Sequence, residues 1–128
     1  MIRKQVDTAV TLDIVNPSKG EVLKNTLVGW HEFVHHAFYL ISLFRGATYT
    51  RIYISKGLLR FVGLAQNPLE QSLLDRFSQS IAKDTALRCM ICGQRGYRRK
   101  LEMGWPCLCT EHYIEYANDE APSTDPES

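Results

Sequence analysis

Four cysteines lie within twenty-one residues near the C-terminal end of this 128-residue chain: Cys89, Cys92, Cys107 and Cys109. In a reducing compartment, clustered thiols more often hold a metal ion than pair with each other. The first ten residues contain no apolar run as long as that of a signal peptide. The longest apolar stretch, 37–44, is far shorter than the roughly twenty residues that a bilayer span needs. We therefore expect a cytoplasmic protein without a membrane partner, in which these thiols stay reduced.

The spacing of the cysteines predicts one zinc site. Cys89 and Cys92 form a C-x2-C-G motif, in which two thiolates grip one ion above a tight turn. Cys109 and His112 are three positions apart on the expected first turn of a helix, which places both side chains on one face. Three thiolates and one imidazole close a tetrahedral shell, as in structural rather than catalytic zinc sites. Cys107 is an alternative ligand, although it falls in chain expected to be extended.

The remainder of the chain predicts an α+β fold. Apolar residues recur at three and four positions over 26–45, which marks one face of a helix ending near Gly46. Asn67, Pro68 and Glu70 are typical of a helix start, and Leu69, Leu73, Leu74, Phe77 and Ile81 would form its buried stripe. The expected elements are, in order, a strand at 10–14, a turn at 16–20, the helix over 26–45, a hairpin of strands 48–54 and 58–63 joined by 55–57, and the helix from 68.

These patterns divide the chain into three parts. An α+β core, with helix, β-hairpin and helix on a small antiparallel sheet, should cover residues 1–86. A zinc module resembling a treble clef or zinc ribbon should cover 87–117, with a short β-ribbon between Gly93 and Leu108. Residues 118–128 are acidic and rich in proline and serine, so we expect a disordered tail.

Several short motifs together resemble a group of small, largely uncharacterised proteins of bacteriophages, prophages and other bacterial mobile elements. The matching segments cover about residues 29–116: Gly29-Trp30, Gly57-x-Leu59-Arg60-Phe61, Cys89-x2-Cys92-Gly93-x2-Gly96, Gly104-Trp105 and Leu108-Cys109-x2-His112. The hairpin departs from the family pattern K-F-G-x-L-R-F-Y at Ser55, Lys56 and Val62, and Cys107 is usually not a cysteine there. The resemblance implies a metal-stabilised α+β domain of mobile-element origin, without an assigned reaction.

A second metal motif lies in the first long helix. His31, Glu32 and His35 spell H-E-x-x-H, which on a helix holds zinc between two imidazoles while the glutamate serves as the base of a peptidase. No extended peptidase motif follows, Glu70 is the one remote carboxylate candidate for a third ligand, and little chain remains for a substrate cleft. With His36, these residues also fit the polar flank of an amphipathic helix, which needs no metal. A zinc metallopeptidase with a second metal site is therefore an alternative hypothesis.

The ribbon between the two ligand pairs is basic, although the net charge of the whole chain is only +1. It carries Arg95, Tyr97, Arg98, Arg99 and Lys100, and cations interleaved with an aromatic ring suit phosphates and stacked bases. Nucleic-acid binding at these residues is a further alternative. Against it, a zinc ion held by three thiolates has a formal charge of −1, which nearby arginines would offset.

We expect a non-enzymatic protein that binds and modulates a host protein or protein complex, for example a defence or regulatory machine. A closed metal shell supplies no reactive position, and no Ser/His/Asp set, phosphate loop or spaced carboxylate pair occurs. The segment 30–53 also holds more aromatic residues than one helix and a hairpin need internally, so part of it is expected to form a contact surface.

Overall fold

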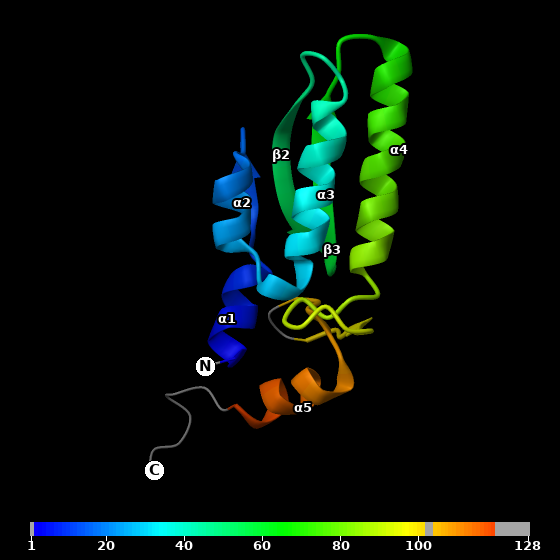
Figure 1. The fold of residues 1–128 in the computed structure, drawn as a ribbon. Coiled ribbons are helices and arrows are strands. Elements are labelled where there is room, and N and C mark those ends of the chain that lie inside the picture. Colours follow the sequence, from blue (N-terminus) through cyan, green and yellow to red (C-terminus); the bar gives the residue numbers. More distant parts are fainter. Residues whose placement is uncertain (1, 102–103, 120–128) are drawn as a thin grey trace.

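The structure, a computed structural model, describes residues 2–101 and 104–119. Most of the predicted acidic tail, 118–128, lies outside the described residues. The fold is α+β, as predicted from the sequence, and a small three-stranded sheet forms its upper part (Figure 1). No helix of the described part of the chain is long and apolar enough to cross a membrane.

The sheet is antiparallel in the order β1-β2-β3. β1 covers Asp13–Val15, β2 Thr48–Ser55 and β3 Leu58–Leu64. The register aligns Ile14 with Ile52 and Ile52 with Phe61, so these side chains share one face of the sheet. Ile52 and Phe61 are buried. The predicted hairpin is therefore present, and its turn uses left-handed backbone at Lys56 (φ 53°) and Gly57 (φ 80°).

Two long helices cover one face of the sheet (Figure 1). α3, His31–Ser42, packs on β2, where the ring of Phe38 meets that of Tyr49 edge-on at 5.2 Å and the Tyr49 hydroxyl donates to the carbonyl of Ala37. α4, Pro68–Thr85, packs on β3. It starts where the sequence predicts, because the Asn67 side chain accepts a hydrogen bond from the amide of Glu70.

The predicted helix over 26–45 is wrong in its N-terminal part. The chain instead forms α2, Lys19–Asn25, then extended backbone at Thr26, then a 3-10 turn, η1, Val28–Trp30, before α3 begins. The tertiary contact of Gly29, whose amide donates to the carbonyl of Met90, replaces a helical hydrogen bond at this point. The turn predicted at 16–20 is also only partly correct, because Lys19 and Gly20 are the first residues of α2 and Ser18 is its N-cap.

The N-terminal prediction also needs correction. Ile2–Ala9 forms helix α1, and the strand expected at 10–14 begins only at Asp13. Val10 follows the last residue of this helix, and its amide still donates a helical hydrogen bond to the carbonyl of Val6. On α4, Leu74 and Ile81 are buried as expected, whereas Leu69 and Leu73 are 72% and 37% exposed and do not belong to the core.

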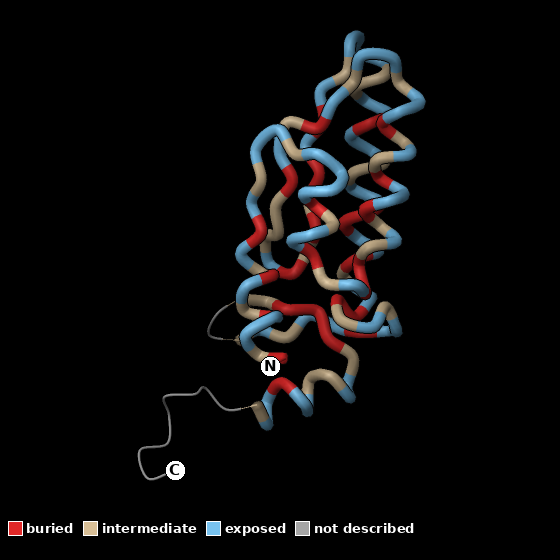
Figure 2. Tube along the Cα trace, turned by 60° about the vertical axis from the view of Figure 1, so that its left-hand side comes forward, coloured by how far each residue is buried: buried red, intermediate tan, exposed pale blue. Residues whose placement is uncertain are grey.

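The buried side chains form one continuous cluster that extends from the sheet into the C-terminal part of the chain. The cluster includes Trp30 from the α/β part of the chain. It also includes Met90, Leu108 and Tyr116, which follow α4 in the sequence. Figure 2 shows buried positions along both parts. The segments predicted as a core (1–86) and a zinc module (87–117) thus share a hydrophobic core. Shared burial of this kind fixes the position of the C-terminal cysteines relative to the helices.

Candidate metal centre

The first pair of sulfur donors lies on a tight loop after α4. The amide of Cys89 donates to the carbonyl of Gln94, and the amide of Gly93 donates back to the carbonyl of Cys89 at 2.8 Å. Gly93 has a φ of +80°, which favours glycine because it has no Cβ. These bonds curl the backbone so that Cys89 is buried while Cys92 is exposed. The C-x2-C-G motif therefore makes the knuckle that the sequence predicts.

The second pair of donors follows a short ribbon. β4, Tyr97–Arg98, pairs antiparallel with β5, Cys107–Leu108, and delivers the chain to α5, Thr110–Asn118. Cys109 is the N-cap of α5, and its Sγ accepts a hydrogen bond from the amide of His112. The thiol of Cys109 and the imidazole of His112 consequently lie together at the start of the helix.

The two pairs meet. The donor atoms of Cys89, Cys92, Cys109 and His112 all lie within 4.8 Å of one another and could hold a metal ion. The Sγ atoms of Cys92 and Cys109 are 3.9 Å apart, and His112 Nδ1 lies 3.6 Å from Cys89 Sγ and 3.2 Å from Cys109 Sγ. Among residues 2–101 and 104–119, this is the one group of three or more His, Cys, Asp or Glu donors arranged in this way.

The two knuckle thiols differ in acidity. Burial raises the pKa of Cys89, but hydrogen bonds from the backbone amides of Cys109, Cys92 and Ile91 outweigh burial and lower its pKa below the ordinary value. Desolvation, with the neighbouring Cys89 thiolate, raises the pKa of Cys92 to about 11. The Cys89 thiol therefore ionises more easily than the Cys92 thiol, which keeps its proton at neutral pH.

Cys107, the alternative ligand, is not part of the metal-binding group. Its side chain is completely buried, and its Sγ donates to the carbonyl of Ala86. Burial raises its pKa to about 12, so the thiol stays protonated at neutral pH. The side chain of Cys107, on β5, belongs to the hydrophobic core instead.

Gly29 and Trp30 lock the knuckle onto the rest of the fold. The amide of Gly29 donates to the carbonyl of Met90, and Trp30 Nε1 donates to the carbonyl of Arg88 at 2.8 Å. A Cβ on Gly29 would lie 2.2 Å from the carbonyl oxygen of Cys89, so only glycine fits. The sequence singled out this pair as part of a motif but did not reveal its role, because both bonds go to backbone atoms some sixty residues away.

The H-E-x-x-H residues are not gathered into a metal-binding group within the described parts of the chain. His31 Nε2 lies 3.0 Å from the carbonyl oxygen of Thr26, and Glu32 and His35 are exposed. His35 and His36 line an open hollow between α3 and α4 together with Asp84, near the C-terminal end of α4. Glu70, the remote candidate ligand, is in the first turn of α4 and therefore at the other end of that helix.

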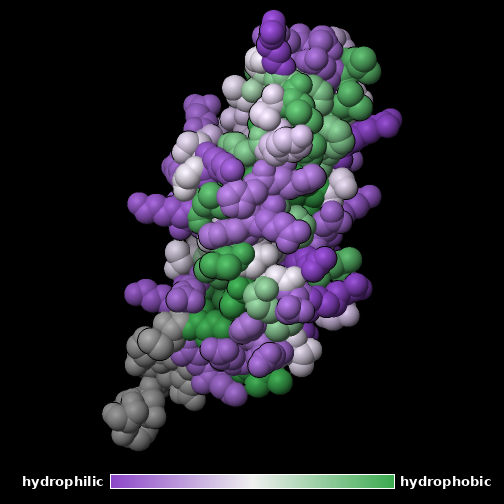
Figure 3. All heavy atoms as spheres, in the orientation of Figure 1, coloured by the Kyte–Doolittle hydropathy of each residue, from purple (hydrophilic) through white to green (hydrophobic). Residues whose placement is uncertain are grey.

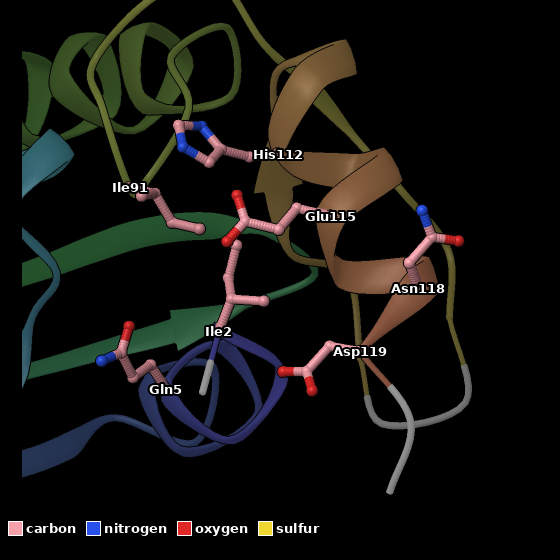
Figure 4. A pocket seen from close by; sticks show the side chains of 7 residues that line it. All are labelled: Ile2, Gln5, Ile91, His112, Glu115, Asn118 and Asp119. Carbon is pink, nitrogen blue, oxygen red and sulfur yellow. The ribbon is translucent and has the colours of Figure 1, made fainter.

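A second hollow, of about 680 Å³, lies beside the metal centre between α1 and α5 (Figure 4). Ile2 and Ile91 form an apolar wall of this hollow, and His112 borders the hollow. The carboxylate of Glu115 points toward Ile2 (Figure 4). Asp119 at its rim accepts a hydrogen bond from the amide of Arg3. The hollow gives solvent a path to one side of His112, and its own charge is negative.

Comparisons with known proteins found no similar protein. No family model matches the chain, and neither the curated proteins nor the solved structures contain a match. The resemblance to mobile-element proteins stays a prediction from the sequence motifs.

Proposed function

We propose that this chain is a non-enzymatic interaction protein whose C-terminal part is held together by one zinc ion. The observation that carries the proposal is the convergence of three sulfurs and one imidazole within 4.8 Å. A tetrahedral ion with Zn–S bonds of about 2.3 Å places neighbouring sulfurs about 3.8 Å apart. The distance of 3.9 Å between the sulfurs of Cys92 and Cys109 fits this geometry.

The donor set also favours a structural role for the ion. Four protein ligands fill a tetrahedral shell and leave no position for a reactive water. A knuckle, a short antiparallel ribbon and a helix that starts at the third ligand are the parts of a treble clef, which we propose as the architecture of 87–117. A structural zinc ion can contribute about 10 kcal/mol to folding. Because this part shares a core with α1, α3 and the sheet, metal removal is expected to destabilise the whole chain.

The proposed partner is a protein, and the proposed contact surface lies at the end of the molecule opposite the metal centre. There α3 ends, β3 ends and α4 begins, and large apolar side chains are exposed (Figure 3). We call this surface the distal apolar patch; its members are Tyr39, Leu43, Leu64, Leu69 and Leu73. A patch of exposed apolar side chains is typical of a protein interaction site.

The nature of the partner follows from the sequence motifs. Their resemblance to small proteins of bacterial mobile elements supports a bacterial host protein or protein complex, such as a defence or regulatory machine. No activity is required of the chain itself in this proposal, since binding alone suffices to block or redirect a host complex.

Two measurements test the metal part of the proposal. Elemental analysis of the purified chain should give one zinc per chain, and EDTA should lower the melting temperature. A metal-free chain that melts cooperatively at the same temperature with and without EDTA would overturn it.

Paired variants test the protein-binding part. Affinity purification of the zinc-loaded chain from a bacterial lysate, followed by mass spectrometry, should recover a host protein. Leu69→Asp should abolish the recovery, because a carboxylate then has to be desolvated in the interface. Val28→Asp is the matched control, since Val28 is 73% exposed but lies on η1, outside the distal apolar patch. Equal recovery with both variants, or recovery of nucleic acid alone, would contradict the proposal.

A further inference from the structure

One face of the β4–β5 ribbon carries a ladder in which guanidinium groups and aromatic rings alternate. The guanidinium of Arg95 lies 5.7 Å from the ring centre of Tyr97, and that of Arg99 lies 5.9 Å from Tyr97 and 4.6 Å from Tyr113. Residues 95, 97 and 99 alternate along extended chain and so point to the same side. We call Arg95, Tyr97, Arg99 and Tyr113 the ribbon ladder. Arg99 is held in place by its Nε and Nη2 atoms, which donate to the carbonyl of Leu108.

The opposite face of the ribbon is fixed to the body of the protein. Arg98 lies over the ring of Trp105 and donates to the carbonyl of Lys56 in the β2–β3 turn. A Cβ on Gly57 would lie 2.4 Å from the carbonyl oxygen of Trp105, so this contact is close. On the ribbon ladder, Arg95 is exposed and Tyr97 is 49% exposed, so both side chains are open to solvent.

The ladder belongs to a basic segment. Five Lys or Arg residues and no Asp or Glu occur from Arg88 to Lys100. Within the described residues, the ion pair that forms is the one between Arg51 and Asp13 on the sheet, so the guanidinium groups of the ladder are not neutralised by a carboxylate. Glu32 and Asp84 line the hollow next to Arg95 and mark the edge of the basic surface.

We propose that the ribbon ladder binds single-stranded nucleic acid, with a base stacked on Tyr97 and the flanking phosphates held by Arg95 and Arg99. An exposed ring between two cations matches the repeat of base and phosphate along a single strand. In a duplex the faces of the bases are hidden in the stack, so Tyr97 would have nothing to stack on. An acidic peptide would pair with the guanidinium groups but leave the ring unused.

This inference rests on the zinc-held module of the proposed function, because β5 leads directly into Cys109. It does not depend on the distal apolar patch or on a protein partner. Binding is therefore measured on chain whose zinc content has been established, and the two proposals can fail separately.

The test uses fluorescence anisotropy with a labelled 15-nucleotide single strand, as DNA and as RNA, and with the corresponding duplex DNA. We expect the single strands to bind more tightly than the duplex, with affinity falling as salt rises. Tyr97→Ala should weaken binding at least about fivefold, and Tyr97→Phe should restore it, because stacking needs the ring and not the hydroxyl. Arg95→Ala should weaken binding and flatten the salt dependence by about 0.7 in the slope of log K against log salt.

Two variants elsewhere on the surface serve as matched controls. Tyr39→Ala removes a tyrosine that is 63% exposed on α3, and Arg60→Ala removes one positive charge from the sheet. Both should bind as the unmodified chain does. Zinc-loaded chain that binds no single strand would overturn the inference. So would equal binding of single strand, duplex and heparin that Tyr97→Ala leaves unchanged, because phosphate charge alone would then account for it. Chain that holds no zinc at all contradicts the proposed function instead.

Discussion

Trp30 Nε1 donates a hydrogen bond to the carbonyl oxygen of Arg88, 2.8 Å away, and so ties the start of α3 to the residue that precedes the first metal ligand. The indole is 1% exposed and belongs to the common hydrophobic core. Together with the bond between Gly29 and Met90, it holds the knuckle in one orientation against the helices. The metal centre is therefore supported by the α/β part of the fold as well as by its own ligands.

Trp30→Phe tests this support. The change removes the indole donor, leaves the Arg88 carbonyl without it and creates a small void in the core. We expect the free energy of unfolding of the zinc-loaded chain to fall by about 2 kcal/mol. Urea denaturation at fixed zinc concentration measures it. A loss below about 0.5 kcal/mol would show that the knuckle does not need this bond.

Gly29→Ala should be more damaging than its size suggests. The added Cβ would meet the backbone at Cys89 O, 2.2 Å, and Gly93 N, 2.6 Å, and neither can rotate away. We expect a loss of at least about 2 kcal/mol in the free energy of unfolding, together with weaker zinc binding. Gly20→Ala is the matched control, because nothing lies within 4 Å of its Cβ position on α2 and alanine favours helix. Equal stability of the two variants would contradict the fit described for Gly29.

The parts of this fold that local sequence patterns determine were predictable. The hairpin has its glycine turn, α4 has its Asn67 cap, and the metal ligands follow spacings that bring two donors onto one turn. Gly46 does have left-handed backbone, with a φ of +77°, but the prediction that it caps this helix is wrong, because α3 ends at Ser42 with Leu43 as its C-cap.

The parts that failed depend on contacts distant in sequence. The helical pattern over 26–45 does not reveal that Gly29 bonds to Met90, and that bond divides the segment into α2, η1 and α3. α1 was missed because contacts with α5, far along the chain, hold it: the Tyr116 hydroxyl donates to Asp7, and the backbone of Tyr116 accepts from Arg3. Leu69 fits the helical stripe of α4 but lies beyond the end of the sheet that the stripe covers.

Cys107→Ser should keep the metal, and Cys109→Ser should lose it. Cys107 lies outside the donor group, and a serine hydroxyl can still donate to the Ala86 carbonyl. At Cys109 a serine preserves the helix cap, because its oxygen can accept from the His112 amide, so any loss of metal reports the missing thiolate. Zinc per chain after dialysis, by elemental analysis, distinguishes the two. Loss of zinc from Cys107→Ser with its fold intact would make Cys107 a ligand.

The metal stoichiometry separates the two histidine motifs. His112→Ala removes a donor of the group and should lower the zinc content to well below one per chain, whereas His35→Ala should leave it unchanged. Glu32→Gln should likewise leave zinc content and melting temperature as they are, since Glu32 is exposed on α3. Two zinc ions per chain in the unmodified protein, with one lost in His35→Ala, would establish a second site and revive the peptidase hypothesis.

Zinc binding should release protons, and its affinity should rise with pH. The pKa of Cys92 is raised to about 11, so this thiol carries its proton at pH 7 in the metal-free chain and must lose it to become a ligand. Each proton displaced makes the apparent affinity about tenfold stronger per pH unit below that pKa, and acid therefore expels the metal. Calorimetric titration with zinc in two buffers of different ionisation enthalpy should give at least one proton released per zinc at pH 7. Identical heats in the two buffers would mean that no proton leaves, which contradicts ligation by a protonated Cys92.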